Sequence, residues 1–267
     1  MLKFLKKRLG EPASLIFDTA SLTGLGGRLN QEDALAYCSI NPQAACWIVA
    51  DGVGGQEAGE VASQLAVTTI LREFRANPRC SGKNMGQLLE AAHRAVFSAR
   101  LSRPASKHMA TTAAVLIVDH HRAVWGHVGD SRLYHFRDGK LLQRTSDQSL
   151  INMMLECGAL SEDDMADYPQ RNVILHALGQ DNTPQYRING PVAIQAGDGF
   201  LLCTDGVWEL MSDRELLETW QARHSAAAWL AEMQERLEPR VADKNSSGKP
   251  ADNYSALLVK VFPYPEP

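Results

Sequence analysis

The chain has 267 residues, a formal net charge of −4, 45% hydrophobic residues and 22% charged residues. This composition excludes a disordered or fibrous protein, and the length is enough for one large globular domain or two small ones. The acidic balance provides no basic surface that could neutralise many phosphate groups, so we expect no nucleic-acid partner.

The N-terminal residues 1–13 combine lysines and an arginine with leucines, in the pattern of a basic amphipathic turn. Such a turn could bind an anionic membrane, but no apolar core follows it, so it is not a secretory signal. Because so short a helix is marginal in water, we expect a flexible, solvated segment. No apolar run approaches the roughly 20 residues that span a bilayer, and the five cysteines show no paired spacing. The sequence therefore predicts a cytoplasmic protein with reduced thiols and no transmembrane segment.

The first half of the chain contains two groups of predicted strands separated by two predicted helices. Apolar runs and alternation predict strands at 14–23, 34–40 and 46–50. Helical periodicity follows at 57–76 and 84–101, and strands return at 111–119, 122–129, 131–137 and 140–144. His120–His121 and Asp138–Gly139 supply turns between consecutive strands. The second group therefore predicts an antiparallel meander.

The second half of the chain begins with a predicted helix at 148–157 and a polar stretch at 158–180. Strands at 185–195 and 199–204, helices at 212–221 and 225–237, a polar loop at 240–253 and a strand at 254–262 complete the chain. Strands in runs and helices in pairs favour an α+β sandwich over alternating βαβ units. We find no internal repeat and no linker that would divide the chain.

Acidic residues gather at or near the ends of the predicted strands. They are Glu32, Asp33, Asp51, Asp130, Asp205 and Asp252. Loops at strand ends can converge on one site, and carboxylates that converge there repel one another unless a cation neutralises them. Taken singly, each aspartate would fit a turn or a helix cap equally well. Together they predict a site that holds a shared cation.

The predicted ligands are all oxygen atoms, with no cluster of histidines or cysteines and no HExxH sequence. This chemistry suits Mg²⁺, Mn²⁺ or Ca²⁺ and argues against a zinc site. Two such ions about 3.5–4 Å apart could share one water and clamp the oxygens of a displacement at phosphorus. The glycines near residues 24–27 and 52–55 complete neither GxGxxG nor a P-loop, so a nucleotide site is weakly supported.

Five motifs occur in a fixed order along the chain: Arg28–Ala34 (RLNQEDA), Asp51–Gly55 (DGVGG), Gly129–Arg132 (GDSR), Asp205–Gly206 and Asp252–Asn253. In content and order this set resembles the type 2C family of metal-dependent serine/threonine protein phosphatases, in its compact bacterial branch. The resemblance extends from about residue 14 to 262. It implies an α-β-β-α sandwich of four layers, with two mainly antiparallel sheets and the metal site at one edge between them.

The resemblance also implies a domain organisation. Residues 14–262 would form one catalytic domain, followed by a tail at 263–267. The polar stretch at 158–180 would be a flap beside the site, with acidic residues, a proline and an arginine that could influence the choice of substrate. These residues are Glu162, Asp163, Asp164, Asp167, Pro169 and Arg171.

For the core metal pair, the resemblance assigns the bridging position to Asp51. The carbonyl of Gly52 and the carboxylate of Glu32 would bind one Mn²⁺ or Mg²⁺ ion, and Asp205 and Asp252 the other. These roles are implied by the motifs that match the family.

Three further roles follow from the same resemblance. Asp33 would orient metal-bound water. Asp130, together with Asp205, would hold a third and weaker ion. Arg28 would grip the substrate phosphate, a task suited to a planar guanidinium, although a surface ion pair is the alternative.

Two positions depart from the family pattern, because Val53 and Gln148 stand where many members have histidine. Val53 cannot transfer a proton, so the general acid remains unidentified. No catalytic role is assigned to His93, His127 or His176. Cys203 lies close to Asp205, but the apolar run before it favours a buried strand residue over a nucleophile.

The function implied is hydrolysis of phosphoserine and phosphothreonine in proteins by direct attack of a metal-bridging water or hydroxide, without a phosphoenzyme. Such an enzyme would oppose a Ser/Thr kinase, and the kinase itself or a forkhead-associated-domain protein is the expected partner by family analogy. Two alternatives stay open: a catalytically silent relative that binds phosphoproteins, and a metal-dependent phosphatase of small phosphorylated metabolites.

Overall fold

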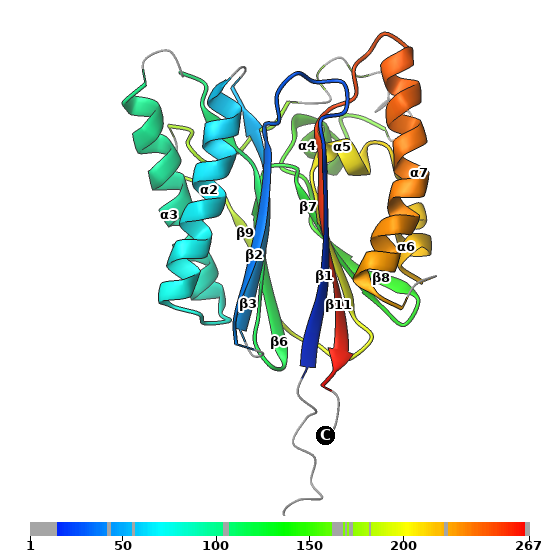
Figure 1. Ribbon diagram of the computed structural model, residues 1–267. Coiled ribbons are helices and arrows are strands. Elements are labelled where there is room, and N and C mark those ends of the chain that lie inside the picture. The colour runs from blue at the N-terminus through cyan, green and yellow to red at the C-terminus, as the bar shows by residue number, and fades with distance from the viewer. Residues whose placement is uncertain are drawn as a thin grey trace, which may run out of the picture.

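The computed structural model describes residues 15–41, 44–54, 57–103, 107–161, 168, 170, 173–181, 183–221 and 224–264. Two β-sheets pack face to face, and a pair of long or medium helices covers the outer face of each (Figure 1). The predicted four-layer α-β-β-α sandwich is confirmed. In the described part of the chain, no helix is long and apolar enough to cross a membrane.

The first sheet contains, among the described residues, five antiparallel strands in the order β1-β11-β10-β7-β8. Their bounds are β1 Leu15–Gly24, β11 Tyr254–Pro263, β10 Gly199–Cys203, β7 Arg132–Arg137 and β8 Lys140–Arg144. The strands nearest the two chain ends, β1 and β11, are paired along their whole length. The first sheet therefore joins the N-terminal and C-terminal parts of the fold.

The second sheet has the order β2-β3-β5-β6-β9, and the short β4 also pairs with β3. Its bounds are β2 Asp33–Asn41, β3 Ala44–Val53, β4 Ala110–Thr111, β5 Ala113–Val118, β6 Arg122–Val128 and β9 Arg187–Ala193. The predicted meander is thus divided between the sheets: β5 and β6 belong to the second sheet, and β7 and β8 to the first.

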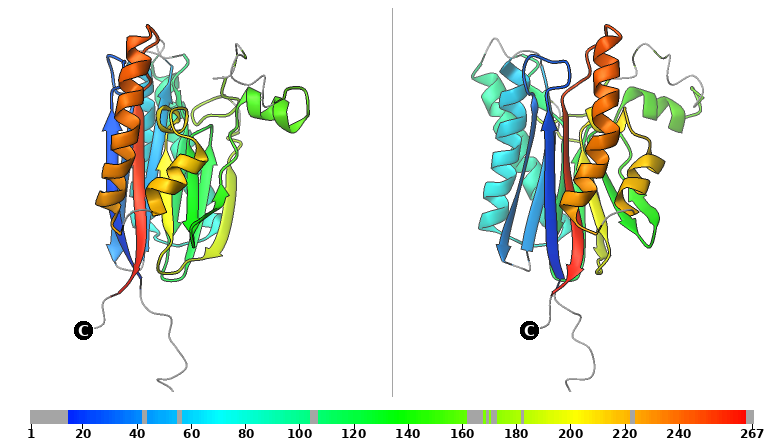
Figure 2. Two further views of the ribbon diagram at one scale, coloured as in Figure 1. Left: turned by 90° about the vertical axis from the view of Figure 1, so that its right-hand side faces the viewer. Right: turned by 45° about the vertical axis from the view of Figure 1, so that its right-hand side comes forward.

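Helices α2 (Glu57–Ala76) and α3 (Gly82–Leu101) cover the second sheet, and α6 (Asp213–Gln221) and α7 (Ala226–Ser246) cover the first (Figure 1). The short helix α5 (Asp205–Trp208) follows β10. Helix α4 (Leu150–Glu156) stands out from one side of the sandwich, at the same end as α5 (Figure 2).

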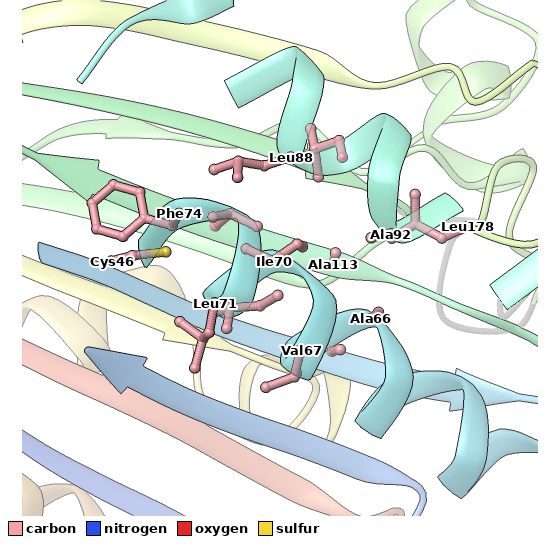
Figure 3. Packing of buried hydrophobic residues seen from close by; sticks show 14 of the residues in the cluster. Cys46, Ala66, Val67, Ile70, Leu71, Phe74, Leu88, Ala92, Ala113 and Leu178 are labelled. Atoms are coloured by element: carbon pink, nitrogen blue, oxygen red, sulfur yellow. The ribbon is translucent and has the colours of Figure 1, made fainter. Parts of the chain in front are cut away.

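Burial on both faces explains why β3 is a continuous apolar run. Alternate side chains of a strand point to opposite faces, so Cys46 and Ile48 pack under α2 and α3, while Trp47 and Val49 pack between the two sheets. Figure 3 shows Cys46 beneath α2 among the apolar residues of that helix. Three apolar layers therefore separate the four layers of backbone.

Two elements differ from the sequence-based prediction. Helix α7 continues to Ser246 through Pro239, so the predicted polar loop at 240–253 is wrong in its first half. Leu237 and Val241, one turn apart, are both buried against the first sheet, and this packing offsets the hydrogen bond that a proline removes. Helix α5 was not predicted, because four residues are too few to show a helical period.

Several predicted segments fall partly or wholly outside the described residues. They include the basic segment 1–13, the last residues of the tail 263–267, and the named residues of the predicted flap, Glu162, Asp163, Asp164, Asp167, Pro169 and Arg171. After α4, the described chain returns to the sandwich at 173–178, where isolated bridges join Ser149 to Ile174 and Thr111 to Leu178.

Candidate metal centre

The acidic residues singled out in the sequence lie at one end of the sandwich. Glu32 precedes β2 and Asp33 begins it, Asp51 is near the end of β3, Asp130 follows β6, Asp205 begins α5 and Asp252 precedes β11. Asp33 and Asp51 are register partners in adjacent strands. In Figure 1 this end is at the top, opposite the end at which β1 begins and β11 ends.

The carboxylates of this cluster perturb one another. Burial raises the pKa of Asp51 well above its usual range, and the nearby negative charges of Asp205, Asp33, Asp130 and Asp252 raise it further. The pKa of Asp205 is likewise raised well above its usual range, first by burial and then by Asp130 and Asp252. The structure therefore brings these five predicted residues within electrostatic reach of one another, and their negative charges repel.

Asp33 and Asp130 occupy the most enclosed positions, each with a relative exposure of 6%. Burial raises the pKa of each to about 7. One oxygen of Asp33, Oδ2, accepts a hydrogen bond of 2.9 Å from the Thr204 hydroxyl. Asp130 is also influenced by Asp147, whose carboxylate raises the Asp130 pKa, and by Arg132, which lowers it.

Three buried carboxylate oxygens have no hydrogen-bond partner among the described residues: Oδ1 of Asp33, of Asp130 and of Asp205. A buried, unpartnered carboxylate oxygen is costly, and a cation is the partner that would also relieve the mutual repulsion. The donor set consists of oxygen atoms, which suits Mg²⁺ or Mn²⁺. The residues present therefore fit hard cations in charge and in chemistry.

The fit is one of composition and placement, since no group of three or more Asp, Glu, His or Cys side chains in the described residues is arranged so as to hold an ion as it stands. Asp252 illustrates the reason: its Oδ2 lies 2.7 Å from Nη2 of Arg28, and its Oδ1 accepts from the Asn253 amide. Binding of an ion by Asp51, Asp205 and Asp252 together would require rotation of side chains within the cluster.

Gly52 and Gly59 allow the backbones of β3 and α2 to approach each other closely beside Glu32. A Cβ atom at Gly59 would lie 2.4 Å from Oε2 of Glu32 and 2.8 Å from the carbonyl oxygen of Gly52. A Cβ at Gly52 would lie 2.0 Å from the Gly59 carbonyl. The Glu32 carboxylate and the Gly52 carbonyl were predicted to bind the same ion. Both lie against Gly59 in α2. Burial raises the pKa of Glu32 as well.

Thr111 and Thr112 hold the main chain of Asp51. The Asp51 amide donates to Oγ1 of Thr112 at 2.9 Å, and the Asp51 carbonyl accepts from the Thr111 hydroxyl at 2.9 Å and from the Thr112 amide at 2.8 Å. Both threonines are fully buried. These hydrogen bonds fix the strand end that carries Asp51.

Asn253 fixes the loop that carries Arg28. Its side-chain amide donates to the carbonyls of Leu25 and Asn30, and its Oδ1 accepts from the Glu32 amide at 2.8 Å. Arg28 itself is half exposed, with 52% of its side-chain surface accessible, and its ion pair with Asp252 places it at the rim of the carboxylate cluster.

Several residues that contact this region had no role predicted from the sequence. Thr204, Asn253 and Gly59 contact the cluster or its loops, and Trp208 donates from Nε1 to the carbonyl of Asp130 at 3.0 Å. Asn253 and Thr204 do flank the acidic motifs in sequence, which was the available signal. The position of Trp208 depends on the unpredicted helix α5.

Cys203 and His127, for which no catalytic role was predicted, are both buried. Cys203 is fully buried in the core between the first sheet and its helices, and burial raises its pKa, which does not favour a thiolate nucleophile. His127 is buried, and burial lowers its pKa. All five cysteines are free thiols in the structure.

Comparison with known proteins identifies relatives over most of the chain. The family model described as "Protein phosphatase 2C" matches residues 26–245. The serine/threonine protein phosphatase PstP of Mycobacterium tuberculosis is 34% identical over 199 residues, which are 73% of this chain and 37% of PstP. The chain thus spans well under half the length of PstP. The protein phosphatase PhpP of Streptococcus pneumoniae is 30% identical over 210 residues, 73% of this chain and 80% of PhpP.

Solved structures with the same fold include a serine/threonine phosphatase of S. agalactiae. It superposes with a TM-score of 0.78 at 26% identity and covers 91% of this chain and 99% of that one. The catalytic domain of PstP in complex with two manganese ions superposes with a TM-score of 0.74 at 27% identity, covering 93% of this chain and all of that domain.

Proposed function

Because this chain belongs to the protein phosphatase 2C family, we propose that it is a metal-dependent protein serine/threonine phosphatase that hydrolyses phosphoserine and phosphothreonine by direct attack of water on phosphorus. One observation carries the proposal: several strand ends bring desolvated carboxylates together, and three of their buried oxygens lack a hydrogen-bond partner among the described residues. A polyanionic substrate could not approach this cluster unless cations neutralised it.

In this proposal Asp51 would contribute to holding both ions of a pair, one of them together with Glu32 and the Gly52 carbonyl and the other together with Asp205 and Asp252. Asp130 would help to hold a third, weaker ion. When bound, Mn²⁺ or Mg²⁺ ions would lower the pKa of water and offset the charge of the phosphate. The presence of two manganese ions in the PstP catalytic domain supports the choice of metal.

The remaining side chains act on the water and the phosphate. Asp33, with one oxygen bonded to Thr204 and the other without a partner in the described residues, would orient water and accept its proton. Arg28 can exchange its exposed contact with Asp252 for the substrate phosphate. Because no imidazole stands at position 53, protonation of the leaving group would fall to water.

A phosphatase of this kind would oppose a Ser/Thr kinase, and phosphorylated proteins, including that kinase or a forkhead-associated-domain protein, are its proposed substrates. We place it in the cytoplasm. Relatives named as serine/threonine phosphatases support the substrate class, and the specific phosphoprotein is best identified by comparing phosphoproteomes with and without the protein.

The proposal is tested with the purified protein, a phosphothreonine peptide and an aryl phosphate. Both should be hydrolysed with Mn²⁺ or Mg²⁺, activity should stop with excess chelator, and added Mn²⁺ should restore it. Small phosphorylated metabolites serve as the comparison substrates. Full activity without metal would refute the mechanism, binding of the peptide without turnover would indicate a silent relative, and preference for metabolites would refute the protein-substrate assignment.

A further inference from the structure

Gln148 lies at the junction of three chain segments, and the proposed chemistry gives it no task. It precedes α4, is 7% exposed, and stands where the resembling family commonly has histidine. Each of its four polar groups, two on the main chain and two on the side chain, makes a hydrogen bond. A residue that is buried and fully hydrogen-bonded to three separate segments restrains all of them.

Two of these bonds clamp the glycine before Asp130. The Gln148 amide donates to the Gly129 carbonyl at 3.0 Å, and the Gly129 amide donates to Oε1 of Gln148 at 2.9 Å. Gly129 has a φ of +89°, and a Cβ there would lie 2.7 Å from Cγ2 of Thr112, so position 129 itself can carry no side chain that anchors the turn.

The other two bonds of Gln148 reach the chain that returns to the sandwich after α4. The Gln148 carbonyl accepts from the Leu175 amide at 2.8 Å, and Nε2 of Gln148 donates to the carbonyl of Gln185. Leu175 and Gln185 both belong to the part of the chain between α4 and β9. Gln148 therefore connects this returning stretch to the turn that carries Asp130.

Asp130 is held from its other side as well. Its carbonyl accepts from the Trp208 indole at 3.0 Å, and the Trp208 ring is covered by the Arg132 guanidinium, 3.6 Å from the ring centre. Its own Oδ1 is buried without a hydrogen-bond partner in the described residues. The direction of the Asp130 carboxylate thus depends on main-chain bonds to its neighbours, of which Gln148 supplies two.

We propose that Gln148 is a positioning residue that aims the Asp130 carboxylate and couples its position to the chain at Leu175 and at Gln185. The inference rests on the proposed role of Asp130 as a ligand for the weaker ion. A neutral imidazole can also accept at one nitrogen and donate at the other, so histidine could serve both Gly129 and Gln185 from this position. Glutamine and histidine therefore both offer one acceptor and one donor here, whereas an apolar side chain of the same length offers neither.

The test compares Gln148→Met, which removes both side-chain bonds, with Gln148→His, which can restore them. Gln143→Met, at an exposed position on β8, is the matched control. In Gln148→Met we expect the half-saturating Mn²⁺ concentration for turnover to rise about tenfold, the effect typical of residues that orient a metal ligand. Tight Mn²⁺ binding measured by calorimetry should stay within about twofold of wild type. Gln148→His and Gln143→Met should behave as wild type.

A second measurement does not depend on activity. In the metal-free protein, hydrogen exchange of the Gly129 amide should be about tenfold faster in Gln148→Met than in wild type and normal in Gln148→His. If Gln148→Met does not fold, Gln148→Asn, which is one methylene too short to reach both partners, should show the same acceleration. Unchanged exchange at Gly129 in a folded variant would overturn the inference. A wild-type protein without metal-dependent turnover would instead refute the proposed function and leave the exchange test intact.

Discussion

Asp51 and Asp130 both belong to the carboxylate cluster, but their neighbours differ. Four carboxylates of the cluster raise the pKa of Asp51, whereas Asp147 is the first charge to act on Asp130, followed by Arg132. We therefore expect Asp51→Asn to abolish tight Mn²⁺ binding and activity. Asp130→Asn should keep tight binding and lose turnover at ordinary metal concentrations. Calorimetry and a Mn²⁺ titration of activity measure the two effects.

The control for this pair is Asp138→Asn, the same exchange at an exposed turn between β7 and β8. Asn tolerates the positive φ of 49° found there, so neither binding nor activity should change. Equal loss of tight binding in Asp51→Asn and Asp130→Asn would contradict a separate site at Asp130. Wild-type activity in Asp51→Asn would contradict the metal centre as a whole.

Arg28 can be examined separately, since its partner in the fold is an exposed ion pair. Removal of such a pair costs at most about 1 kcal/mol of stability. If Arg28 holds the phosphate equally in the ground and transition states, Arg28→Ala should raise KM several-fold and change kcat little. Steady-state kinetics with a phosphothreonine peptide would show this. Arg72→Ala, on the exposed face of α2, is the control, and an unchanged KM in Arg28→Ala would exclude phosphate binding.

Single residues at this site were predictable from the sequence when they are acidic and follow a predicted strand. Asp51 and Asp205 are examples, because an apolar run followed by an aspartate is visible without a structure. Thr204 and Trp208 were not predictable, since an ordinary threonine and tryptophan acquire their roles only from the three-dimensional approach of Asp33 and of Asp130.

Helix α2 contributes to the metal centre through a missing side chain. A glycine inside a helix costs about 0.5–1 kcal/mol relative to alanine, so Gly59 is unfavourable for the helix itself. Its replacement by alanine would place a Cβ 2.4 Å from Oε2 of Glu32. We expect Gly59→Ala to displace Glu32 and to weaken Mn²⁺ binding by about tenfold or more. Calorimetry and measurement of activity at limiting Mn²⁺ would detect this loss of affinity.

Gly82→Ala, at the start of α3, is the matched control. A Cβ at Gly82 would meet Cγ2 of Ile188 at 3.6 Å, an ordinary contact, so this variant should bind metal normally and gain up to about 1 kcal/mol of stability. If both variants bind Mn²⁺ as wild type does, the close approach between α2 and Glu32 is not needed for the metal centre.

Helices and strands were predictable from the sequence where the periodic spacing of apolar residues matches the face that is buried in the fold. Helix α2 was predicted with its observed bounds, 57–76, because its periodic pattern is long and ends in a polar stretch. Helix α7 was predicted too short, since Pro239 is a local signal for an end and the packing of Val241 is not visible in the sequence. Partition of the meander between two sheets was also not predictable, because a turn does not reveal which sheet its strands join.

The metal centre affects the stability of the whole molecule through its protonation. Burial raises the pKa of Asp33 and of Asp130 to about 7, so between about pH 4 and 7 the folded state binds more protons than the unfolded state. The free energy of unfolding of the metal-free protein should therefore fall as pH rises through this range. From pH 6 to pH 8 the loss should be on the order of 1 kcal/mol for each group.

Urea titrations in chelator at pH 6 and pH 8 measure this loss. Mn²⁺ replaces the protons, so at pH 8 a concentration 100 times the dissociation constant should add about 2.7 kcal/mol. The metal should stabilise the protein more at pH 8 than at pH 6, since protons compete with it at the lower pH. A metal-free protein that is more stable at pH 8 would show that these carboxyl groups are not desolvated in the fold.

The pairing of β1 with β11 also has a consequence for the order of the chain. Leu15 and Pro263 are register partners at the end of the sandwich away from the metal centre, so the described chain is nearly a closed ring (Figure 1). A short linker could close it, and new ends could be opened at an exposed hairpin such as Asp138–Gly139. The carboxylates would then be supplied in a permuted order. Their assembly depends on which strands are neighbours in space, and a circular permutant should keep those neighbours.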